Sequence, residues 1–399
     1  MNRNSKILPF PSAARETASG RHLIPERITE ARIVEKLSQT DLSRLVGVKR
    51  QSISYFESGE RNPDPETLRM IADALKQPMA YFATPSAPKF GKRTANFFRK
   101  HGPDTKRRNA ASDQYAEWFS QVTFALTDFV NLPEVTLPSF EPSGEHDDPN
   151  RYTWDEIEEL AGKTREHLGL GLGPISNVVR LVETHGVTVG RLILKGENVS
   201  AFSFWSGDRP FIFLASDKES SARARFDACH ELAHLVLHRW VTQDEIDDKT
   251  RLKEIEKEAD YFAGAFLLPR RSFPAEVLSP RLSSFLDLKL RWKVSIQAMV
   301  YRCKSLGIFD EDQCVNLYKQ ISAKNWRTKE PFDGPDGLPL EEPLLLRRVA
   351  ELVFAENRMR RDELLCRLGF SPSIAELLLG LPNGSLADTP SDDLTIDLK

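Results

Sequence analysis

The stretch His230-Glu231-Leu232-Ala233-His234 decides the fold of the central part of the chain. In a helix, residues four positions apart lie one turn apart on the same face, so both imidazoles of this HExxH pattern point the same way. Two histidine nitrogens at that spacing can bind one tetrahedral Zn²⁺, and Glu231 is then placed as a base toward a metal-activated water. The pattern also occurs by chance in ordinary helices, so the flanking sequence has to be weighed with it.

The flanking residues predict a helix from Phe226 to His238 that borders a hydrophobic core. At about 100° per residue, one broad apolar arc forms. Its members are Phe226, Cys229, Leu232, Ala233, Val236 and Leu237. The histidines lie at the edge of this arc. His238 lies on the same edge, and we interpret it as a polar support of the metal site and not as a fourth ligand, because three residues and a water complete a zinc site.

A second helix, predicted from Glu254 to Leu267, supplies a third ligand. Glu256 projects into the middle of its apolar arc, whereas Glu254 and Glu258 are expected to project away from that arc. A carboxylate buried without a partner costs several kcal/mol, and a bound metal ion removes that cost. Asp260 follows one turn after Glu256, where it can accept a hydrogen bond from a ligand imidazole.

The predicted ligands His230, His234 and Glu256 leave one position for water, which is typical of catalytic zinc. Two alternatives stay open: a solvated helix whose histidines have no role, and a metal site that has lost catalysis. No residue can be assigned to stabilise an oxyanion. Residue type alone suggests Tyr261, Arg223 and Arg225.

The composition is that of an ordinary globular protein with roughly two to four domains in its 399 residues. No apolar run reaches the length of a membrane span, and no membrane association is expected. The net charge of −3 means that nucleic-acid binding has to come from a local patch. Four scattered cysteines fit reduced thiols in the cytoplasm better than disulfides. Residues 1–20 lack a hydrophobic segment and are predicted to be a disordered tail, not a secretory signal.

Residues 38–57, SQTDLSRLVGVKRQSISYFE, predict a short helix, a turn at Gly47 and a second short helix. This is a helix-turn-helix pattern, in which the second helix enters the major groove of DNA. The segment resembles the XRE (Cro/repressor-like) helix-turn-helix family, and the resemblance continues through Gly59-Glu60-Arg61-Asn62-Pro63. It implies a DNA-binding domain over residues 21–86, built as a five-helix bundle.

The resemblance also implies which residues contact DNA. Arg50, Gln51 and Ser54 occupy the base-contacting positions of the second helix. Arginine suits the acceptors of guanine and glutamine suits adenine, both by paired hydrogen bonds. Phosphate contacts are implied for Gln39, Arg61 and Asn62.

Lys49 departs from the family, which usually has Ser or Thr as the helix cap at this position. Lysine cannot accept hydrogen bonds from the helix amides and opposes the helix dipole, so we expect it to contact a phosphate. The partner is then an operator in double-stranded DNA, bound by a homodimer because such repressors pair on two-fold sites. The alternative is a helix-turn-helix used only for packing or dimerisation.

Residues 87–150 are predicted to be a basic and helical linker region. It contains a basic stretch from Lys89 to Arg108, a helix from Asp113 to Asn131 and a proline-rich stretch after it. The basic stretch can be a solvated face or can follow the DNA phosphates, and both interpretations stay open.

Residues 151–278 predict a domain with a small sheet. Strands are expected at Val187–Arg191, Val199–Trp205 and Pro210–Leu214, directly before the HExxH helix. Helices are expected at Trp154–Leu168 and Ile175–His185. Residues 279–399 are predicted to be a helical region, with a helical pair in Phe285–Gly307 and three short helices in Leu344–Leu381. The fold class is therefore α+β and predominantly α.

Residues 201–269 resemble the ImmA/IrrE metallo-endopeptidase family. The resemblance is carried by AFSFW at 201–205, RFDACHELAHLVLH at 225–238 and EKEADYFA at 256–263. In that family the two HExxH histidines and the first Glu of the second helix bind zinc, which corresponds to His230, His234 and Glu256. The family often has Asn at the position of Asp260. The resemblance implies a zincin-like fold with an edge strand that binds extended substrate, for which Ala201–Trp205 is the candidate.

These features together predict a cytoplasmic transcriptional regulator with a zinc-dependent endopeptidase domain. By resemblance, relatives cleave repressors, so the expected substrate is a repressor, an antitoxin or this chain itself. One alternative is a repressor that does not cut, in which the peptidase-like domain senses a ligand or partner. A third hypothesis treats both domains as docking surfaces.

Overall fold

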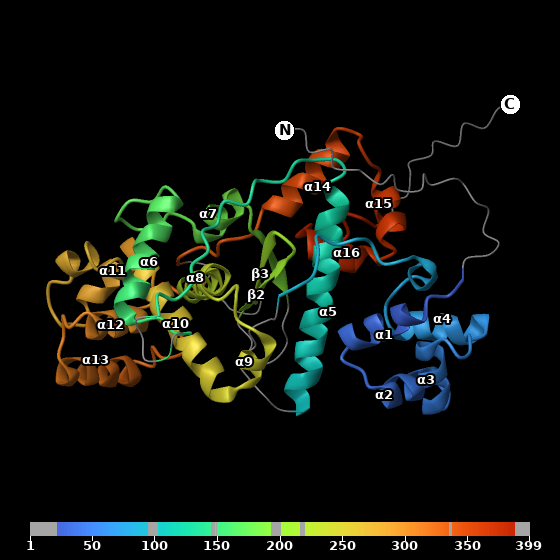
Figure 1. Cartoon of the computed structure of the whole chain (residues 1–399), viewed down its shortest axis with the longest axis horizontal. Helices are drawn as coiled ribbons and strands as arrows, with labels where there is room; N and C mark the ends of the chain where they lie inside the picture. Colours follow the sequence, from blue (N-terminus) through green and yellow to red (C-terminus); the bar gives the residue numbers. More distant parts are fainter. Residues whose placement is uncertain are drawn as a thin grey trace. The chain divides into compact units, whose positions relative to one another are not determined.

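The structure, a computed structural model, describes residues 22–94, 103–144, 148, 150–192, 201–215, 220–334 and 337–387 (Figure 1). The tail predicted at residues 1–20 lies outside these ranges, as do the end of the chain and parts of the basic and proline-rich stretches. The chain divides into two compact units, Met1–Pro85 and Ser86–Lys399. Each unit is described by itself.

The first unit consists of four α-helices and a closing 3-10 helix. They are α1 Pro25–Val34, α2 Gln39–Val46, α3 Arg50–Ser58, α4 Pro65–Ala74 and η1 Met79–Ala83. Ser38 and Asp41 form a capping box that starts α2, and Gly47 ends it in the left-handed conformation with φ of 75°. Ile28, Leu42 and Ile53 are fully buried between the helices. The predicted five-element bundle is observed, with a 3-10 helix as its fifth member.

The second unit is organised around a three-stranded sheet. Its strands are β1 Thr188–Leu192, β2 Ala201–Ser206 and β3 Arg209–Ala215, in the order β1-β3-β2. β1 runs parallel to β3, and β2 forms an antiparallel hairpin with it. The central strand β3 is buried along most of its length, because side chains on both faces of the sheet meet helices. In the order β1-β3-β2, strand β2 lies at one edge of the sheet.

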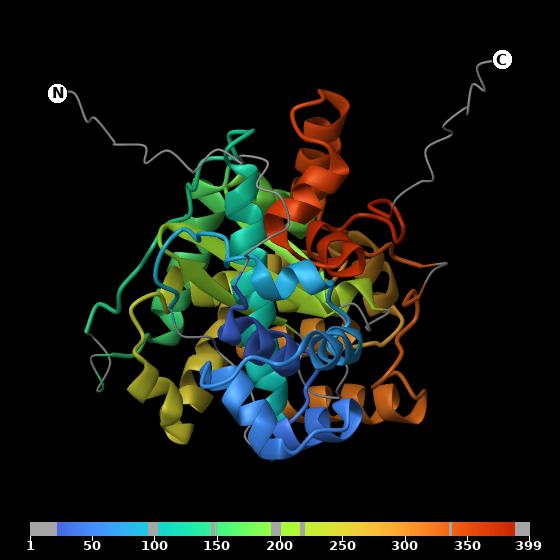
Figure 2. The same cartoon turned by 90° about the vertical axis from the view of Figure 1, so that its right-hand side faces the viewer.

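Two helices cover the two faces of the sheet, α5 Pro103–Leu126 on one side and α8 Ser221–Leu237 on the other (Figures 1 and 2). The Phe119 ring of α5 packs against Phe213, with 4.6 Å between ring centroids. Ile212 and Leu214 face the opposite way, into the core that contains Leu232 of α8. The HExxH helix is thus held flat against the sheet.

Residues 87–150, predicted as a basic and helical linker region, fall within the second unit. Trp118, Phe119 and Val122 of α5 are fully buried. After Leu126 the chain runs extended, and the Phe140 amide donates to the carbonyl of Val236 at 2.8 Å. The helix predicted from Asp113 to Asn131 is observed as Pro103–Leu126, so it starts earlier and ends earlier. Its first turns are polar, so the spacing of apolar residues does not indicate where it starts.

The helices around the HExxH segment are α6 Trp154–His167, α7 Val178–Thr184, α9 Gln243–Asp247 and α10 Lys249–Leu267. Both α8 and α10 begin five residues before their predicted starts, after the side-chain caps Ser220 and Asp248. The early turns are polar on most sides, so apolar periodicity does not mark them. The carbonyl of Leu237 at the end of α8 accepts from the Tyr152 hydroxyl at 2.8 Å, which satisfies an otherwise open helix end.

The remaining elements are η2 Phe273–Glu276, α11 Ser284–Trp292, α12 Ile296–Ser305, α13 Glu311–Ala323, α14 Leu345–Ala355, α15 Arg361–Leu368 and α16 Pro372–Leu379. α13 lies in the region predicted to be helical, but it was not predicted as a separate helix. Trp292, Met299 and Val300 belong to the same core as Phe262 and Phe266 of α10, so α11 and α12 complete the domain of the HExxH helix. The protein is mostly helical with one small sheet, as expected. Within the described ranges, none of the helices combines the length and the hydropathy that a bilayer crossing requires.

Candidate metal centre

α8 and α10 pack directly against each other, and this packing brings the predicted ligands together. Ala259 and Ala263 of α10 are fully buried and belong to the same core as Leu232 and Ala233 of α8. Small side chains at these positions let the two helices approach closely. Glu256, one turn before Ala259 on the buried side of α10, consequently faces the two histidines of α8.

The side chains of His230, His234 and Glu256 converge on one point. The two Nε2 atoms lie 3.0 Å apart, and Glu256 places its carboxylate oxygens 3.6 Å from His230 Nε2 and 3.4 Å from His234 Nε2. Ligand atoms at zinc bond lengths and tetrahedral angles are about 3.3 Å apart. These three residues therefore fit a zinc ion, and they form the one candidate group for a metal among the described residues.

The electrostatics of the cluster favour a cation. Burial lowers the pKa of His234 to about 3. Burial also acts to lower the pKa of His230, but hydrogen bonds to Asp260 and Glu256 outweigh it and raise that pKa to about 10. Burial acts to raise the pKa of Glu256, yet the same two histidines hold it well below its usual range. In the metal-free site the positive charge beside the ionised Glu256 carboxylate is the proton on His230, and a divalent metal replaces that proton when it binds.

Glu231 is buried and its carboxylate is fixed by the sheet. Ser203 of β2 donates from Oγ to Glu231 Oε2 at 2.7 Å. No role was predicted for Ser203 from the sequence. A signal was present, because Ser203 is the one polar residue within the apolar run Ala201–Trp205 of a strand that is buried almost throughout.

Two further polar contacts hold the histidines. Asp260 places Oδ1 2.8 Å from His230 Nδ1, and its side chain is about half exposed. His238 places Nδ1 2.9 Å from His234 Nδ1, and its Nε2 lies 3.1 Å from Glu258 Oε2.

The prediction that Glu258 projects away from the core is wrong, since its side chain is 1% exposed. The reason is that α10 packs on α6 as well as on α8, so a second face of the helix is buried. Glu254, for which the same was predicted, is 26% exposed and pairs with Arg151 at 3.1 Å.

Two parts of the chain match known families. Residues 182–304 match the IrrE N-terminal-like domain (Peptidase_M78), and residues 28–82 match the helix-turn-helix family (HTH_3). The chain joins a helix-turn-helix domain to an IrrE N-terminal-like domain.

Whole-chain comparisons add little. None of the curated proteins matches the chain. A solved Mycobacterium tuberculosis transcriptional regulator aligns at 19% identity and a TM-score of 0.28, over 37% of this chain and 46% of that one. The chain thus spans less than half of the regulator, and an alignment this weak carries no argument.

In the IrrE N-terminal-like domain, Arg225 is not placed to stabilise an oxyanion. Its guanidinium is buried, pairs with Glu341 and donates to the carbonyl of Ile175 at 2.7 Å. It joins the C-terminal segment to the start of α7, where Glu341 also accepts from the amide of Val178. Arg223 is exposed, and Tyr261 packs against Trp154 with 4.8 Å between ring centroids.

In the helix-turn-helix domain, the residues with implied DNA contacts lie at the start of α2, in or at the cap of α3, and just after α3. The exposed members are Lys49, Arg50, Gln51, Arg61 and Asn62, and the half-buried ones are Gln39 and Ser54. Lys49 stands at the N-cap of α3 without a side-chain hydrogen bond to the helix. Gln39 donates to Glu57 at 2.8 Å and thereby links the start of α2 to the end of α3.

Proposed function

We propose that this chain is a cytoplasmic DNA-binding transcriptional regulator whose IrrE N-terminal-like domain is a zinc-dependent endopeptidase. The supporting observation is that His230, His234 and Glu256 meet at ligand distances, with Glu231 of the same HExxH pattern fixed beside them. A structural zinc site uses four protein ligands, whereas three leave room for water and substrate. The match to a peptidase family supports the same conclusion.

The protein residues have distinct roles in the proposed hydrolysis. His230, His234 and Glu256 would hold Zn²⁺, which when bound polarises a peptide carbonyl and makes a water molecule more acidic. Glu231 accepts the proton of that water and delivers it to the leaving amine. Ser203 fixes the orientation of the Glu231 carboxylate through their 2.7 Å hydrogen bond. Asp260 keeps the ring of His230 in position from the side away from the metal.

The substrate is proposed to be a polypeptide bound in extended form. β2 lies at the edge of the sheet and carries Ser203, so a strand added along it passes the catalytic centre. A repressor, an antitoxin or a copy of this chain are the proposed substrates.

The partner of the first unit is proposed to be an operator in double-stranded DNA, bound by a homodimer. Arg50, Gln51 and Ser54 are proposed to contact bases, because they belong to the second helix of the motif, where Arg50 and Gln51 are exposed and Ser54 is half-buried. Phosphates are contacted by Gln39, Lys49, Arg61 and Asn62. The open cap of α3 at Lys49 suits a phosphate oxygen, which accepts from the helix amides and from the lysine.

Metal analysis combined with Glu231→Gln tests the peptidase proposal. The purified chain is expected to contain one zinc per molecule and to cleave a protein encoded by a neighbouring gene. Glu231→Gln should keep zinc and DNA binding and lose cleavage. Unchanged cleavage removes Glu231 from the mechanism, and zinc binding without any cleavage favours a regulator that senses a ligand instead.

A further inference from the structure

A buried chain of polar groups continues from His234 away from the proposed zinc position. His234 Nδ1 lies 2.9 Å from His238 Nδ1, and His238 Nε2 lies 3.1 Å from Glu258 Oε2. The side chains of His238 and Glu258 are almost completely buried. Buried polar groups at such distances are hydrogen-bonded, so their protons have defined places.

The geometry permits one proton arrangement when His234 is a ligand. His234 Nε2 faces His230 Nε2 and Glu256, so its lone pair points into the proposed site. The remaining proton of a neutral His234 is then on Nδ1. Two ring nitrogens 2.9 Å apart cannot both carry protons, so His238 accepts at Nδ1 and donates from Nε2 to Glu258.

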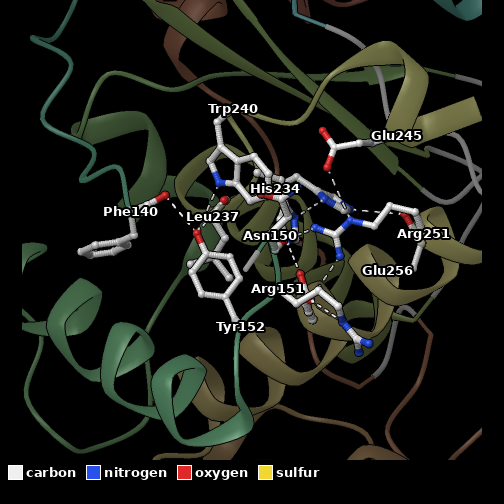
Figure 3. Close-up of polar contacts among 12 residues, drawn as sticks. Phe140, Asn150, Arg151, Tyr152, His234, Leu237, Trp240, Glu245, Arg251 and Glu256 are labelled. Carbon is white, nitrogen blue, oxygen red and sulfur yellow. Dashed lines mark hydrogen bonds and ion pairs between the residues drawn. The ribbon is translucent and has the colours of Figure 1, made fainter. Parts of the chain in front are cut away.

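Arginines compensate the charge at the end of this chain. Arg251 places Nη1 3.6 Å from Glu258 Oε1, and Arg151 places Nε 3.8 Å from the same oxygen. Figure 3 shows Arg151 and Arg251 in one polar network with His234. A carboxylate buried beside two guanidinium groups does not leave an uncompensated charge. Its other oxygen, Oε2, is the acceptor for His238.

We propose that His238 and Glu258 are positioning residues that orient His234 for metal binding. The proposal rests on the zinc site proposed above. Glu258 orders His238, His238 accepts the Nδ1 proton of His234, and this contact directs Nε2 of His234 toward the metal and increases its basicity. A network that serves packing alone would affect the stability of the fold but not the affinity or geometry of the metal site.

The test compares zinc affinities of paired variants by competition with a chromophoric chelator. His238→Phe keeps a ring of similar size without nitrogen, and zinc binding should weaken about 10- to 100-fold. His238→Gln can accept from His234 and donate to Glu258, so it should restore most of the loss. The visible spectrum of Co²⁺-loaded protein reports the ligand geometry directly, and it should change in His238→Phe and not in His238→Gln.

A matched pair on α10 covers the case in which His238→Phe fails to fold. Glu258→Gln and Glu254→Gln make the same change one turn apart, and both residues lie beside Arg151. Zinc affinity should fall in Glu258→Gln alone. Unfolding temperatures of the metal-free variants show whether a fold defect accompanies the change.

The outcomes separate the two proposals. A parent protein that binds no zinc overturns both the peptidase and the positioning role. A parent that binds zinc tightly, with the same affinity and cobalt spectrum in His238→Phe or with equal affinities in the two glutamate variants, overturns the positioning role and leaves the peptidase proposal intact.

Discussion

Ser203 Oγ lies 2.7 Å from Glu231 Oε2, which joins the middle of β2 to the HExxH helix. A proton acceptor works best when its orientation is fixed before the reaction. Ser203→Ala is therefore expected to lower kcat about tenfold while zinc affinity stays unchanged. Steady-state kinetics with the identified substrate, alongside chelator competition, measure the two effects separately.

Ser206→Ala is the matched control for this prediction. Ser206 is also buried on β2, but its hydroxyl bonds to Ser120 and Gly91 and not to Glu231. Both variants lose a buried hydrogen bond of similar type, so a general loosening of the sheet should affect them alike. Equal kcat values for the two variants would mean that the Ser203 contact has no part in catalysis.

The metal-free protein should lose stability as pH rises above neutral. The pKa of His230 is raised from 6.5 to about 10, so the folded protein keeps a proton that the unfolded chain releases near pH 6.5. That stabilisation is complete below the unfolded pKa and decreases as pH rises toward the folded one. The lowered pKa of His234 affects stability only below about pH 6.5, and buried thiols such as Cys229 act only above about pH 9.

Thermal unfolding of chelator-treated protein between about pH 7 and about pH 8.5 measures this decline. Zinc-loaded protein should not show it, because the metal replaces the proton. Asp260→Asn removes one of the two carboxylates that raise the pKa and should flatten the curve. A flat curve in the metal-free parent would contradict the assigned protonation of His230.

The metal cluster could be predicted because its residues obey local spacing rules. His230 and His234 lie one helical turn apart, and Glu256 interrupts an apolar arc where a charge needs a partner. Glu258 could not be placed in this way, because α10 is buried on two faces and a single arc describes only one of them. The contact of Ser203 with Glu231 joins residues 28 positions apart, and no local pattern encodes it.

The packing of α5, in the region predicted as a linker, could not be predicted for the same reason. The amphipathic pattern of α5 was visible, but the partner of its apolar face was not. Phe119 packs on Phe213, a residue far along the sequence in β3. Strand positions were predicted well because each strand is a short apolar run, whereas their order β1-β3-β2 depends on tertiary pairing.

Operator binding should depend on Arg50 and Lys49 in different ways. Arg50→Ala removes a proposed base contact, so operator affinity should fall by about 1–3 kcal/mol and the base preference should relax. Lys49→Ala removes a proposed phosphate contact and should weaken binding to all sequences while reducing its salt dependence. Titrations of operator and scrambled duplexes at several salt concentrations distinguish the two. Equal affinity of the parent for both duplexes would argue against sequence-specific regulation.

The edge of β2 is partly occupied by the chain itself. The amide of Thr94 donates to the carbonyl of Trp205 at 2.9 Å, and the amide of Gly207 donates to the carbonyl of Lys92 at 3.0 Å. Arg93 holds this segment to α5 through Asp113 at 2.8 Å. A substrate strand that extends along the whole of β2 has to displace these bonds.

Weakening this intrachain pairing should therefore increase cleavage. Thr94→Pro removes the amide that donates to the carbonyl of Trp205 and should raise kcat/KM several-fold, mainly through a lower KM. The reason is that a substrate strand then has fewer intrachain hydrogen bonds to displace from β2. Thr94→Ala keeps the amide and loses only the hydroxyl that accepts from the Trp205 amide at 3.0 Å, so its effect should be smaller. Peptides that end before the position opposite Trp205 should respond to neither substitution. An unchanged kcat/KM for long substrates in Thr94→Pro would show that substrate does not extend along this part of β2.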